Sequence, residues 1–340
     1  MQNHVLDLLP EELTALFRQE GIPGFRSKQL LNWIYTNYKI DLAEMTNLPE
    51  KLRQQLISLL DFQLPKIVKQ LQADDGTTKF LLKLSDQNHI EMVLIPNPGK
   101  NTLCISSQVG CSRGCRFCAT ARLGLVRNLH VSEIVAQVWI AQKFLSEQKL
   151  TNIVFMGMGE PMDNLPNVLK TVRILQKDEC FSISPRRMTI STSGVIPGIK
   201  KLAESGIKVK LAVSLNAAIQ AKREELMPIS KIYTLAELKK VLLDFRQKTA
   251  YRITFEYVMI KDFNMGKEDI KAIFAFLGDI SCKLNLIKWN EVSGLPYKSP
   301  SQKEMEIFIN ALQKLSSAVT FRQSRGAEIA AACGQLAANV

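Results

Sequence analysis

The sequence contains no apolar run that approaches the roughly 18 residues of a membrane-spanning helix, and it has no internal repeat or low-complexity tract. Its first residues, MQNHVLDLLPEELTALF, are acidic where a secretory signal would be basic and then apolar. Histidine is scarce, at three residues in 340, and His4, His89 and His130 have no partners in sequence for metal ligation. These absences argue against a membrane or exported protein, and we expect a cytoplasmic globular chain.

Disulfides are also unexpected, although the sequence contains seven cysteines. The number is odd, the chain is long, and no export signal is present. A disulfide framework belongs to small exported proteins, so metal binding or catalysis is the better interpretation of these thiols. We expect Cys180 and Cys282 to be structural.

Acidic side chains are outnumbered by basic ones. The chain has 44 Lys and Arg against 32 Asp and Glu, which gives a net charge of +12. Such an excess attracts polyanions, and phosphate backbones are the first candidates. A solvated basic surface explains the charge equally well, so charge alone does not decide for nucleic acid.

The apolar pattern changes twice along the chain. Residues 1–60 repeat apolar side chains at helical spacing, whereas residues 61–101 contain strand-like runs around Asp75-Gly76, a hairpin-turn signal. We expect a helical accessory domain over 1–60, a β-hairpin extension over 61–101, and a larger domain over 102–340.

Strand-like and helix-like runs alternate from residue 102 onward. Helical stretches such as 132–148 and 235–249 separate the strands. This alternation predicts an α/β fold with a parallel sheet, either open or curved into a barrel-like arc. The predicted strands cover residues 102–109, 152–158, 187–193, 209–215, 253–260, 284–290 and 318–324.

The strongest local signal is the segment Cys111-Ser-Arg-Gly-Cys115-Arg-Phe-Cys118. Three thiolates in one glycine-containing loop can converge on a soft metal centre. A structural zinc site normally has four ligands, and His130 lies twelve residues beyond the last cysteine. An iron–sulfur cluster with one open iron is therefore favoured, although spacing alone also admits zinc or unrelated buried thiols.

Small or hydrogen-bonding residues follow the carboxyl ends of the predicted strands. Ligand sites of parallel α/β folds gather at these ends. Each segment alone could be a turn or a helix cap, but their shared position favours one site for a polar cofactor. After the cysteine loop, the segments are 157–161, 191–194, 214–216 and Asn290.

The pattern CxxxCxxC, with an aromatic residue before the last cysteine, resembles the cluster motif of the radical S-adenosylmethionine (SAM) superfamily. Together with MGMGEP, ISTSGVIPGI, LAVSLNA, LMPI and AACGQL, it is similar to the dual-specificity RNA adenine-C2 methyltransferases. The resemblance implies a partial (β/α)6 barrel with an N-terminal helical accessory domain and a small β extension. It also implies a [4Fe–4S] cluster and two SAM molecules per turnover.

The same motifs imply which residues hold the cofactors. Cys111, Cys115 and Cys118 would bind the cluster. Asn216 stands where many family members have His, and Glu328 stands where relatives usually have Asp. The SAM contacts implied by the motifs are Gly159, Glu160, Ser191, Ser214, Leu215, Asn216 and Asn290.

Three further residues match the catalytic positions of the family. Cys333, in AACGQL, would carry the methyl group as S-methylcysteine. Cys104, in TLCISSQ, would release the product, and Glu91, in HIEMVLIP, would accept a proton. Carbon 2 of adenine is electron-poor and does not attack a SAM methyl directly, whereas a thiolate does.

The implied mechanism attaches the RNA to the protein for part of the cycle. Cys333 takes a methyl from one SAM, and a radical derived from a second SAM removes a hydrogen atom from that methyl group. The carbon radical adds to adenine; loss of the carbon-2 proton and attack by Cys104 then release methylated RNA and leave a disulfide.

The resemblance also implies partners. The substrates would be 23S rRNA at the peptidyl transferase centre and tRNA at the anticodon loop. The electron donor would be a flavodoxin or ferredoxin, and the protein a monomer without membrane contact. A close relative that methylates carbon 8 of the same rRNA adenine, and confers antibiotic resistance, is the alternative; it tends to lack a residue like Pro161.

Two other classes stay open from the residues alone. A radical SAM enzyme acting on a peptide or small molecule would need neither the positive charge nor a tail cysteine. A metal-bound RNA-binding module would not need the polar strand ends. Basic and aromatic side chains in the N-terminal segment could contact RNA or could be core and surface. These are Arg26, Lys28, Trp33, Tyr35, Tyr38 and Lys39.

Overall fold

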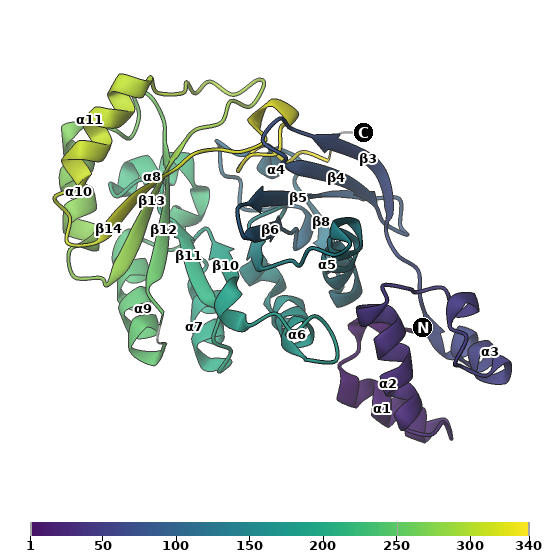
Figure 1. Cartoon of the computed structure of the whole chain (residues 1–340). Helices are drawn as coiled ribbons and strands as arrows, with labels where there is room; N and C mark the ends of the chain where they lie inside the picture. The colour runs from purple at the N-terminus through teal and green to yellow at the C-terminus, as the bar shows by residue number, and fades with distance from the viewer. Residues whose placement is uncertain (1, 250, 339–340) are drawn as a thin grey trace.

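The computed structural model describes residues 2–249 and 251–338, so residues 1 and 339–340, at the ends of the first and third predicted domains, lie outside it. Within this range the centre of the molecule is a ten-stranded mixed sheet (Figure 1). In order, its strands are β14 (Ala318–Arg322), β13 (Cys282–Lys288), β12 (Ile253–Met259), β11 (Lys210–Ser214), β10 (Met188–Thr192), β9 (Asn152–Phe155), β6 (Lys100–Cys104), β5 (His89–Asn97), β4 (Thr78–Lys83) and β3 (Lys66–Gln72).

In this sheet, β6 and the six strands β9 to β14 are parallel. Strands β5, β4 and β3 continue the sheet in antiparallel fashion. A helix connects each parallel strand to the next, which confirms the six predicted βα units and the seventh strand. The sheet is open, because β14 and β3 are its two edges in the described part of the chain. The connecting helices are α5 (Val131–Leu145), α6 (Leu165–Gln176), α7 (Ile196–Glu204), α9 (Leu235–Lys248), α10 (Lys267–Leu277) and α11 (Gln302–Leu312).

Strand β12 illustrates how the sequence divides the two faces of the sheet. Phe255 and Tyr257 are fully buried and pack against Phe276 of α10 and Phe308 of α11. Because side chains alternate along a strand, Glu256 faces the opposite, concave side. The apolar face of the sheet therefore packs against the helices, and the opposite face of the sheet can line a site.

The predicted strand over 102–109 is shorter than expected. Strand β6 ends at Cys104, and residues 108–110 form β7 (Gln108–Gly110), which pairs with β8 (Leu125–Asn128) in a separate antiparallel ribbon. Ile105 still donates to the carbonyl of Val154, but Ser107 already donates to Met158 in the next loop. The chain leaves the sheet here because these loop contacts replace strand pairing, and it then enters the cysteine loop.

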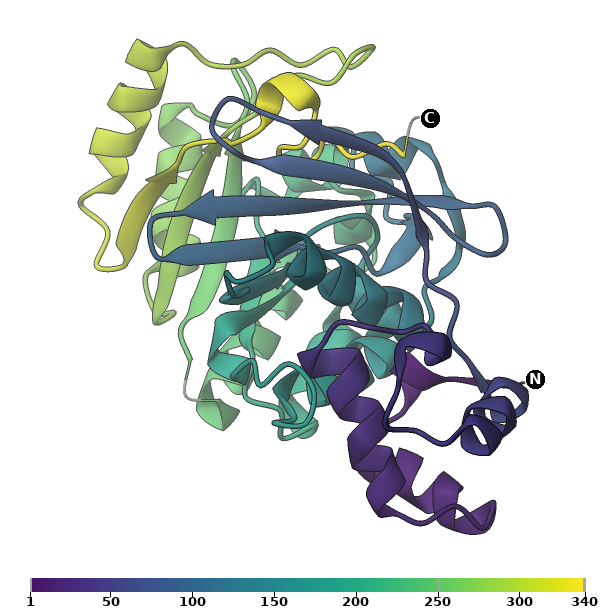
Figure 2. The ribbon, with the colours of Figure 1, turned by 45° about the vertical axis from the view of Figure 1, so that its right-hand side comes forward.

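The N-terminal segment is helical, as predicted. It comprises α1 (Pro10–Gln19), α2 (Phe25–Leu31), the π-helix η2 (Asn32–Thr36) and α3 (Glu50–Leu59), and Figure 2 shows these elements below the antiparallel strands. The Tyr35 ring lies edge-on against Phe181, at 5.0 Å between centroids, and Trp139 donates to the carbonyl of Ile34. Tyr35 is therefore core and does not stack on bases.

Residues of these helices belong to the same apolar core as the parallel strands. The division at residues 60 and 101 stays a prediction. No helix within residues 2–249 and 251–338 is long and apolar enough to cross a membrane.

Candidate active site

Residues 111–118 form a loop between β7 and the short helix α4 (Ala119–Arg122). The Cys111 N–H donates to the carbonyl of Gly124 at 2.8 Å. Gly110 has a φ of 73°, and a Cβ there would lie 1.8 Å from the Gly124 oxygen. Only glycine lets the loop fold back this closely, so local backbone geometry fixes where the first cysteine lies.

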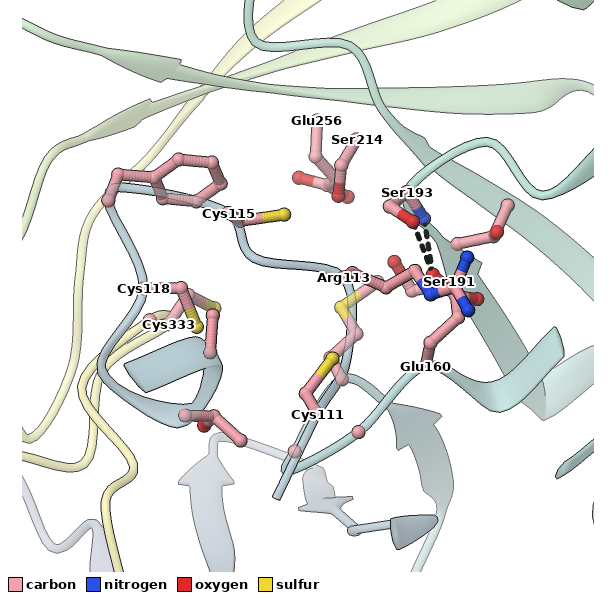
Figure 3. A pocket seen from close by; sticks show the side chains of 18 of the residues that line it. Cys111, Arg113, Cys115, Cys118, Glu160, Ser191, Ser193, Ser214, Glu256 and Cys333 are labelled. Atoms are coloured by element: carbon pink, nitrogen blue, oxygen red, sulfur yellow. Dashed lines mark hydrogen bonds between the residues drawn. The ribbon is translucent and has the colours of Figure 1, made fainter. Parts of the chain in front are cut away.

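The side chains of Cys111, Cys115 and Cys118 point into one cavity of about 160 Å³, hereafter the first cavity (Figure 3). Burial raises the pKa of Cys111 to about 12, and burial together with the neighbouring Cys118 and Cys111 raises the pKa of Cys115 well above its usual value. Three such thiolates need a cationic partner to stay ionised together.

A single metal ion does not suit this arrangement. Among the described residues, no group of three or more His, Cys, Asp or Glu side chains could hold one ion. In a [4Fe–4S] cluster each thiolate binds its own iron, so the three sulfurs surround the group without meeting at one point. The donor set therefore fits a cluster and disfavours the zinc alternative.

Gly159 and Glu160 follow β9 and line the first cavity. Gly159 has a φ of 100°, and a Cβ there would lie 2.6 Å from the Gln108 Cβ. The buried Glu160 carboxylate accepts hydrogen bonds from the Ser193 N–H at 2.7 Å and the Ser193 Oγ at 2.6 Å, which Figure 3 shows. Burial raises the pKa of Glu160, and the Ser193 hydrogen bonds oppose this rise. Glu160 thus ties the ends of β9 and β10 together beside the cysteines.

The other predicted SAM contacts lie in different environments. Ser191, Ser214 and Asn216 line the first cavity. The Asn216 side chain is already hydrogen-bonded, since its Oδ1 accepts from the Val258 N–H at 3.0 Å. Leu215 is fully buried and does not line the cavity.

The tail that carries Cys333 closes one side of the first cavity. The Gly334 carbonyl accepts from the Ala119 N–H at 2.7 Å, and the Leu336 carbonyl accepts from the Thr120 Oγ at 2.6 Å. Cys333 therefore lies beside Cys118, as Figure 3 shows. These contacts attach the tail directly to the end of the cysteine loop.

Asn290, another predicted SAM contact, holds this tail. Its Nδ2 donates to the Cys333 carbonyl at 3.2 Å, and Asn290 does not line the first cavity. In this structure its clearest contact is thus with the predicted methyl-carrying residue.

Glu91 lines neither the first cavity nor the adjacent second cavity, which contains Cys104 in its wall. The residue is 3% exposed; one carboxylate oxygen accepts from the N–H groups of Ala337 and Ala338, and the other lies 3.0 Å from the Lys79 Nζ. Lys79 also donates to the Ala330 carbonyl at 3.1 Å. The predicted proton acceptor therefore joins β4 and β5 to the tail.

Cys104 lines a second cavity of about 360 Å³, which lies next to the first. Cys333 and Arg322 line both cavities, so they form part of a shared wall. Burial raises the pKa of Cys104 to about 12, and Cys333 adds to the rise. The structure thus places Cys104 and Cys333 around one space, and Cys333 also lines the first cavity together with Cys111, Cys115 and Cys118.

Two charged residues were not singled out from the sequence. Glu256 lines the first cavity, whereas Arg223 does not line it but bonds to residues that do. Arg223 is 1% exposed and donates to the carbonyls of Ser193, Ser214 and Leu215, which ties the ends of β10 and β11. The Glu256 Oε2 is buried at the cavity without a hydrogen-bond partner in the described residues. The only signal for Glu256 in the sequence was a charge inside an apolar strand, and the only signal for Arg223 was a charge just before LMPI.

Comparison with known proteins agrees with this site. The profile of the Radical SAM superfamily matches residues 105–277, and that of the ribosomal RNA large subunit methyltransferase N-terminal domain matches residues 3–61. A probable dual-specificity RNA methyltransferase RlmN from Dictyoglomus turgidum is 41% identical over 99% of this chain and 97% of its own length. The chain belongs to the RlmN family of radical SAM methyltransferases.

Two further proteins match over nearly the full length of both chains. The dual-specificity RNA methyltransferase RlmN of Nautilia profundicola is 40% identical over 97% of this chain and 96% of its own. A radical SAM methyltransferase from Sphaerobacter thermophilus superposes with a TM-score of 0.96 and 39% identity, over 99% of this chain and 100% of the other. The radical SAM fold predicted from the motifs is thereby confirmed, and this superfamily uses a [4Fe–4S] cluster and SAM.

Proposed function

We propose that this chain methylates carbon 2 of adenine in RNA, with 23S rRNA at the peptidyl transferase centre and tRNA at the anticodon loop as substrates. The observation that carries the proposal is the position of Cys333. It lies in the wall between the cavity of the three clustered cysteines and the cavity of Cys104. Membership of the RlmN family, whose relatives are named dual-specificity RNA methyltransferases, supports the same substrate class.

The first cavity would hold the cofactors. Cys111, Cys115 and Cys118 would bind the [4Fe–4S] cluster, and the polar strand ends, with Glu160 among them, would contact SAM. Bound there, the cofactors supply methyl groups and the one-electron chemistry that an electron-poor ring carbon requires, with two SAM molecules used per turnover. Arg223 keeps the strand ends in place through its three carbonyl contacts.

Cys333 would carry the methyl group as a thioether, and its tail contacts hold it between the two cavities. Cys104 would attack the Cys333 sulfur once the RNA is attached. A sulfur–sulfur bond then forms as the bond between Cys333 sulfur and the methylene carbon breaks. The methylene carbon keeps the electron pair of that bond and takes a proton, which completes the methyl group and frees the RNA. The second cavity gives both thiols access to the same space.

Glu91 stays our proposed proton acceptor. Both of its oxygens are engaged, one by the tail N–H groups and one by Lys79. For Glu91 to take a proton from the base, either the tail or Lys79 must first release an oxygen. The proposed role therefore requires one of these two contacts to open during turnover.

The carbon-8 reaction is the alternative. Pro161 begins the 3-10 helix η4 (Pro161–Asn164) and lines the first cavity, and the carbon-8 relatives tend to lack this proline. The proline therefore favours carbon 2. We further propose that the protein acts as a cytoplasmic monomer that receives electrons from a flavodoxin or ferredoxin.

Mass spectrometry of rRNA and tRNA from a deletion strain tests the function. We expect 2-methyladenine to disappear from both RNAs and to return with the intact gene. In a reconstituted reaction with trideuterated SAM methyl groups, the product should retain two deuterium atoms, because one is abstracted. A product with three deuterium atoms, or methylation at carbon 8, would contradict the proposal.

A further inference from the structure

Three exposed apolar side chains follow the cysteine loop. Leu123, Leu125 and Val126 are 45%, 44% and 60% exposed, and they line neither of the two cavities. They lie between the end of α4 and the first residues of β8. Apolar side chains that gather on a surface often mark an interaction site. Residues 123–126 are hereafter the exposed segment.

A β-bulge holds Val126 outward in this segment. Leu125 pairs with Gly110 and Arg127 pairs with Val109, so Val126 is the extra residue of the ribbon formed by β7 and β8. A bulge bends its strand and re-aims a side chain, and bulges are common beside active sites. The exposure of Val126 therefore comes from a defined backbone geometry that the pairing with β7 fixes.

The backbone of the exposed segment contacts a residue proposed to bind the cluster. The Gly124 carbonyl accepts from the Cys111 N–H at 2.8 Å, and Leu125 pairs with the residue that precedes Cys111. The segment is thus one hydrogen bond away from a cluster ligand. Electron transfer through protein slows steeply with distance, so a protein that reduces the cluster has to dock close to the cysteine loop. The exposed segment meets this requirement.

The surroundings of the exposed segment are basic. Residues 111–128 contain four arginines and no acidic residue. Arg116 and Arg122 are exposed, whereas Arg127 is held in ion pairs with two carboxylates. Protein interfaces combine an apolar centre with a polar rim and are enriched in arginine. A surface of this composition favours a partner with an acidic face.

RNA is the other acidic partner that this surface could meet. Arginine binds phosphates, but bases are held by aromatic rings or guanidinium planes, which the aliphatic side chains of Leu125 and Val126 do not supply. Aliphatic side chains are suited to burial against another protein. Electron-transfer complexes bury little surface, so a segment of this size is sufficient for one. The side chains therefore favour a protein partner.

We propose that a small, acidic one-electron carrier protein docks on the exposed segment to reduce the cluster. This inference rests on the part of the proposed function in which a flavodoxin or ferredoxin supplies electrons. Leu125 and Val126 pack against the carrier, and Arg116 and Arg122 attract its acidic face. One electron leaves the reduced carrier and enters the cluster beside Cys111. The carrier is oxidised and the cluster is reduced by one electron each, and no bond forms or breaks in this step.

Two reductants separate docking from chemistry. One is a purified bacterial flavodoxin in its fully reduced form, used below saturation; the other is dithionite, which is small and needs no docking surface. Formation of 5′-deoxyadenosine is measured anaerobically with the reconstituted full-length enzyme. We expect Val126→Glu to lower the flavodoxin-driven rate at least about tenfold, because it places a like charge in the interface, and the dithionite-driven rate less than about twofold. The dissociation constant for oxidised flavodoxin, measured by calorimetry, should rise by at least about tenfold as well.

Val68→Glu is the matched control. Val68 is 45% exposed on β3 and lines neither cavity, so both rates should stay within about twofold of the wild type. Iron content and the unfolding midpoint report whether Val126→Glu folds. If it does not, Val126→Ser replaces it; this variant removes apolar contact without adding charge, and the flavodoxin-driven rate should fall about three- to tenfold.

An equal fall in both rates would mean that the substitution acts on the cluster and not on the carrier, which would overturn the inference. An unchanged flavodoxin-driven rate and dissociation constant would also overturn it. Weaker binding of an RNA hairpin with unchanged flavodoxin binding would assign the segment to RNA instead. Methylation of RNA by the wild-type enzyme with dithionite is measured alongside. If no RNA is methylated while Val126→Glu shows its selective effect, the proposed substrate fails and the docking surface remains.

Discussion

The carboxylate of Glu91 accepts a 2.8 Å hydrogen bond from the backbone N–H of Ala337. The contact joins strand β5 to the tail, 246 residues further along the chain, and the same oxygen also accepts from Ala338. A charged acceptor shared by two partly buried N–H groups is a strong anchor. The position of Cys333 therefore depends on a residue that does not touch its cavity.

Glu91→Ala should release the tail. We expect hydrogen exchange of residues 330–338 to rise at least tenfold, since loss of hydrogen bonds to a charged group costs about 1.5–3 kcal/mol. Lys79→Met should act in the same direction, because it leaves a buried carboxylate without its cation. Lys83→Met, on the same strand, is the control. Unchanged exchange in both test variants would mean that the other tail contacts suffice.

Replacement of Cys111, Cys115 or Cys118 by Ala should abolish cluster binding. Each variant should lose most of its iron and all reductive cleavage of SAM, measured by iron assay and 5′-deoxyadenosine formation under anaerobic conditions. Cys180→Ala is the control, because Cys180 is a buried core thiol far in sequence from the loop. Stoichiometric zinc in anaerobically purified protein would contradict the cluster.

Cys104→Ala should trap the RNA on the protein. In the proposed mechanism, methyl transfer to Cys333 does not need Cys104 but release of the product does, so the variant should purify with RNA that survives denaturation. The double variant Cys104→Ala with Cys333→Ala should carry none. Normal turnover by the single variant would remove Cys104 from the mechanism.

The reactivity of Cys104 should depend steeply on pH. Burial raises its pKa to about 12, so the thiol is protonated at neutral pH and its alkylation rate should rise about tenfold per pH unit between pH 7 and 10. In the unfolded chain the thiol ionises nearer 8.5. Ionisation then favours the unfolded state, so the Cys104 contribution to stability is lost as the pH rises from about 9 to 12.

Peptide mass spectrometry of folded and urea-unfolded protein without its cluster measures these alkylation rates. The unfolded thiol should stop gaining reactivity above about pH 9. A plateau at the same pH in the folded protein would mean that Arg322, which opposes the rise in pKa, outweighs burial.

Gly110→Ala should destabilise the protein and displace the cysteine loop. The added Cβ meets the Gly124 oxygen at 1.8 Å, and the φ of 73° is strained for alanine. We expect a loss of about 2–4 kcal/mol in the free energy of unfolding, measured with urea. Gly206→Ala is the control, since it has a similar φ of 70° with nothing nearby. An equal effect at both sites would assign the loss to backbone strain alone.

The fold and one edge of the site could be predicted from the sequence for a simple reason. Parallel strands are buried and separated by amphipathic helices, so their order and ends are visible as a pattern. This placed the cysteine loop, Glu160, Ser191 and Ser214 at one cavity. The early end of β6 was missed, because Ser106 and Ser107 look like strand residues, but the Ser106 hydroxyl donates to the Glu91 carbonyl of β5 and the Ser107 N–H donates to Met158 in the loop after β9.

Contacts between distant segments could not be predicted. Nothing near Arg322 in the sequence shows that it faces Cys104, because the two residues meet only when the ends of the sheet approach. Likewise, the motifs implied that Asn290 contacts SAM, whereas the structure shows its hydrogen bond to Cys333. The motif identifies Asn290 as a candidate site residue, but the group that Asn290 bonds to depends on the path of the tail.

The Gln335 side chain, which donates to the Glu291 carbonyl, and the buried Leu336 help to hold the tail. The groups bound by Asn290, Thr120 and Glu91 are all main-chain carbonyl oxygens or N–H groups. Such contacts are blind to side-chain identity and sensitive only to spacing. Between Cys333 and Ala338, conservative substitution of Ala337 should therefore be tolerated, whereas Gly334, with a φ of 86°, and the buried Leu336 should be less tolerant. A one-residue insertion there would shift the thiol by about 3.3 Å relative to its anchors, and proline at Ala337 would remove a donor. The position of the Cys333 thiol therefore depends on the number of residues between it and its main-chain anchors.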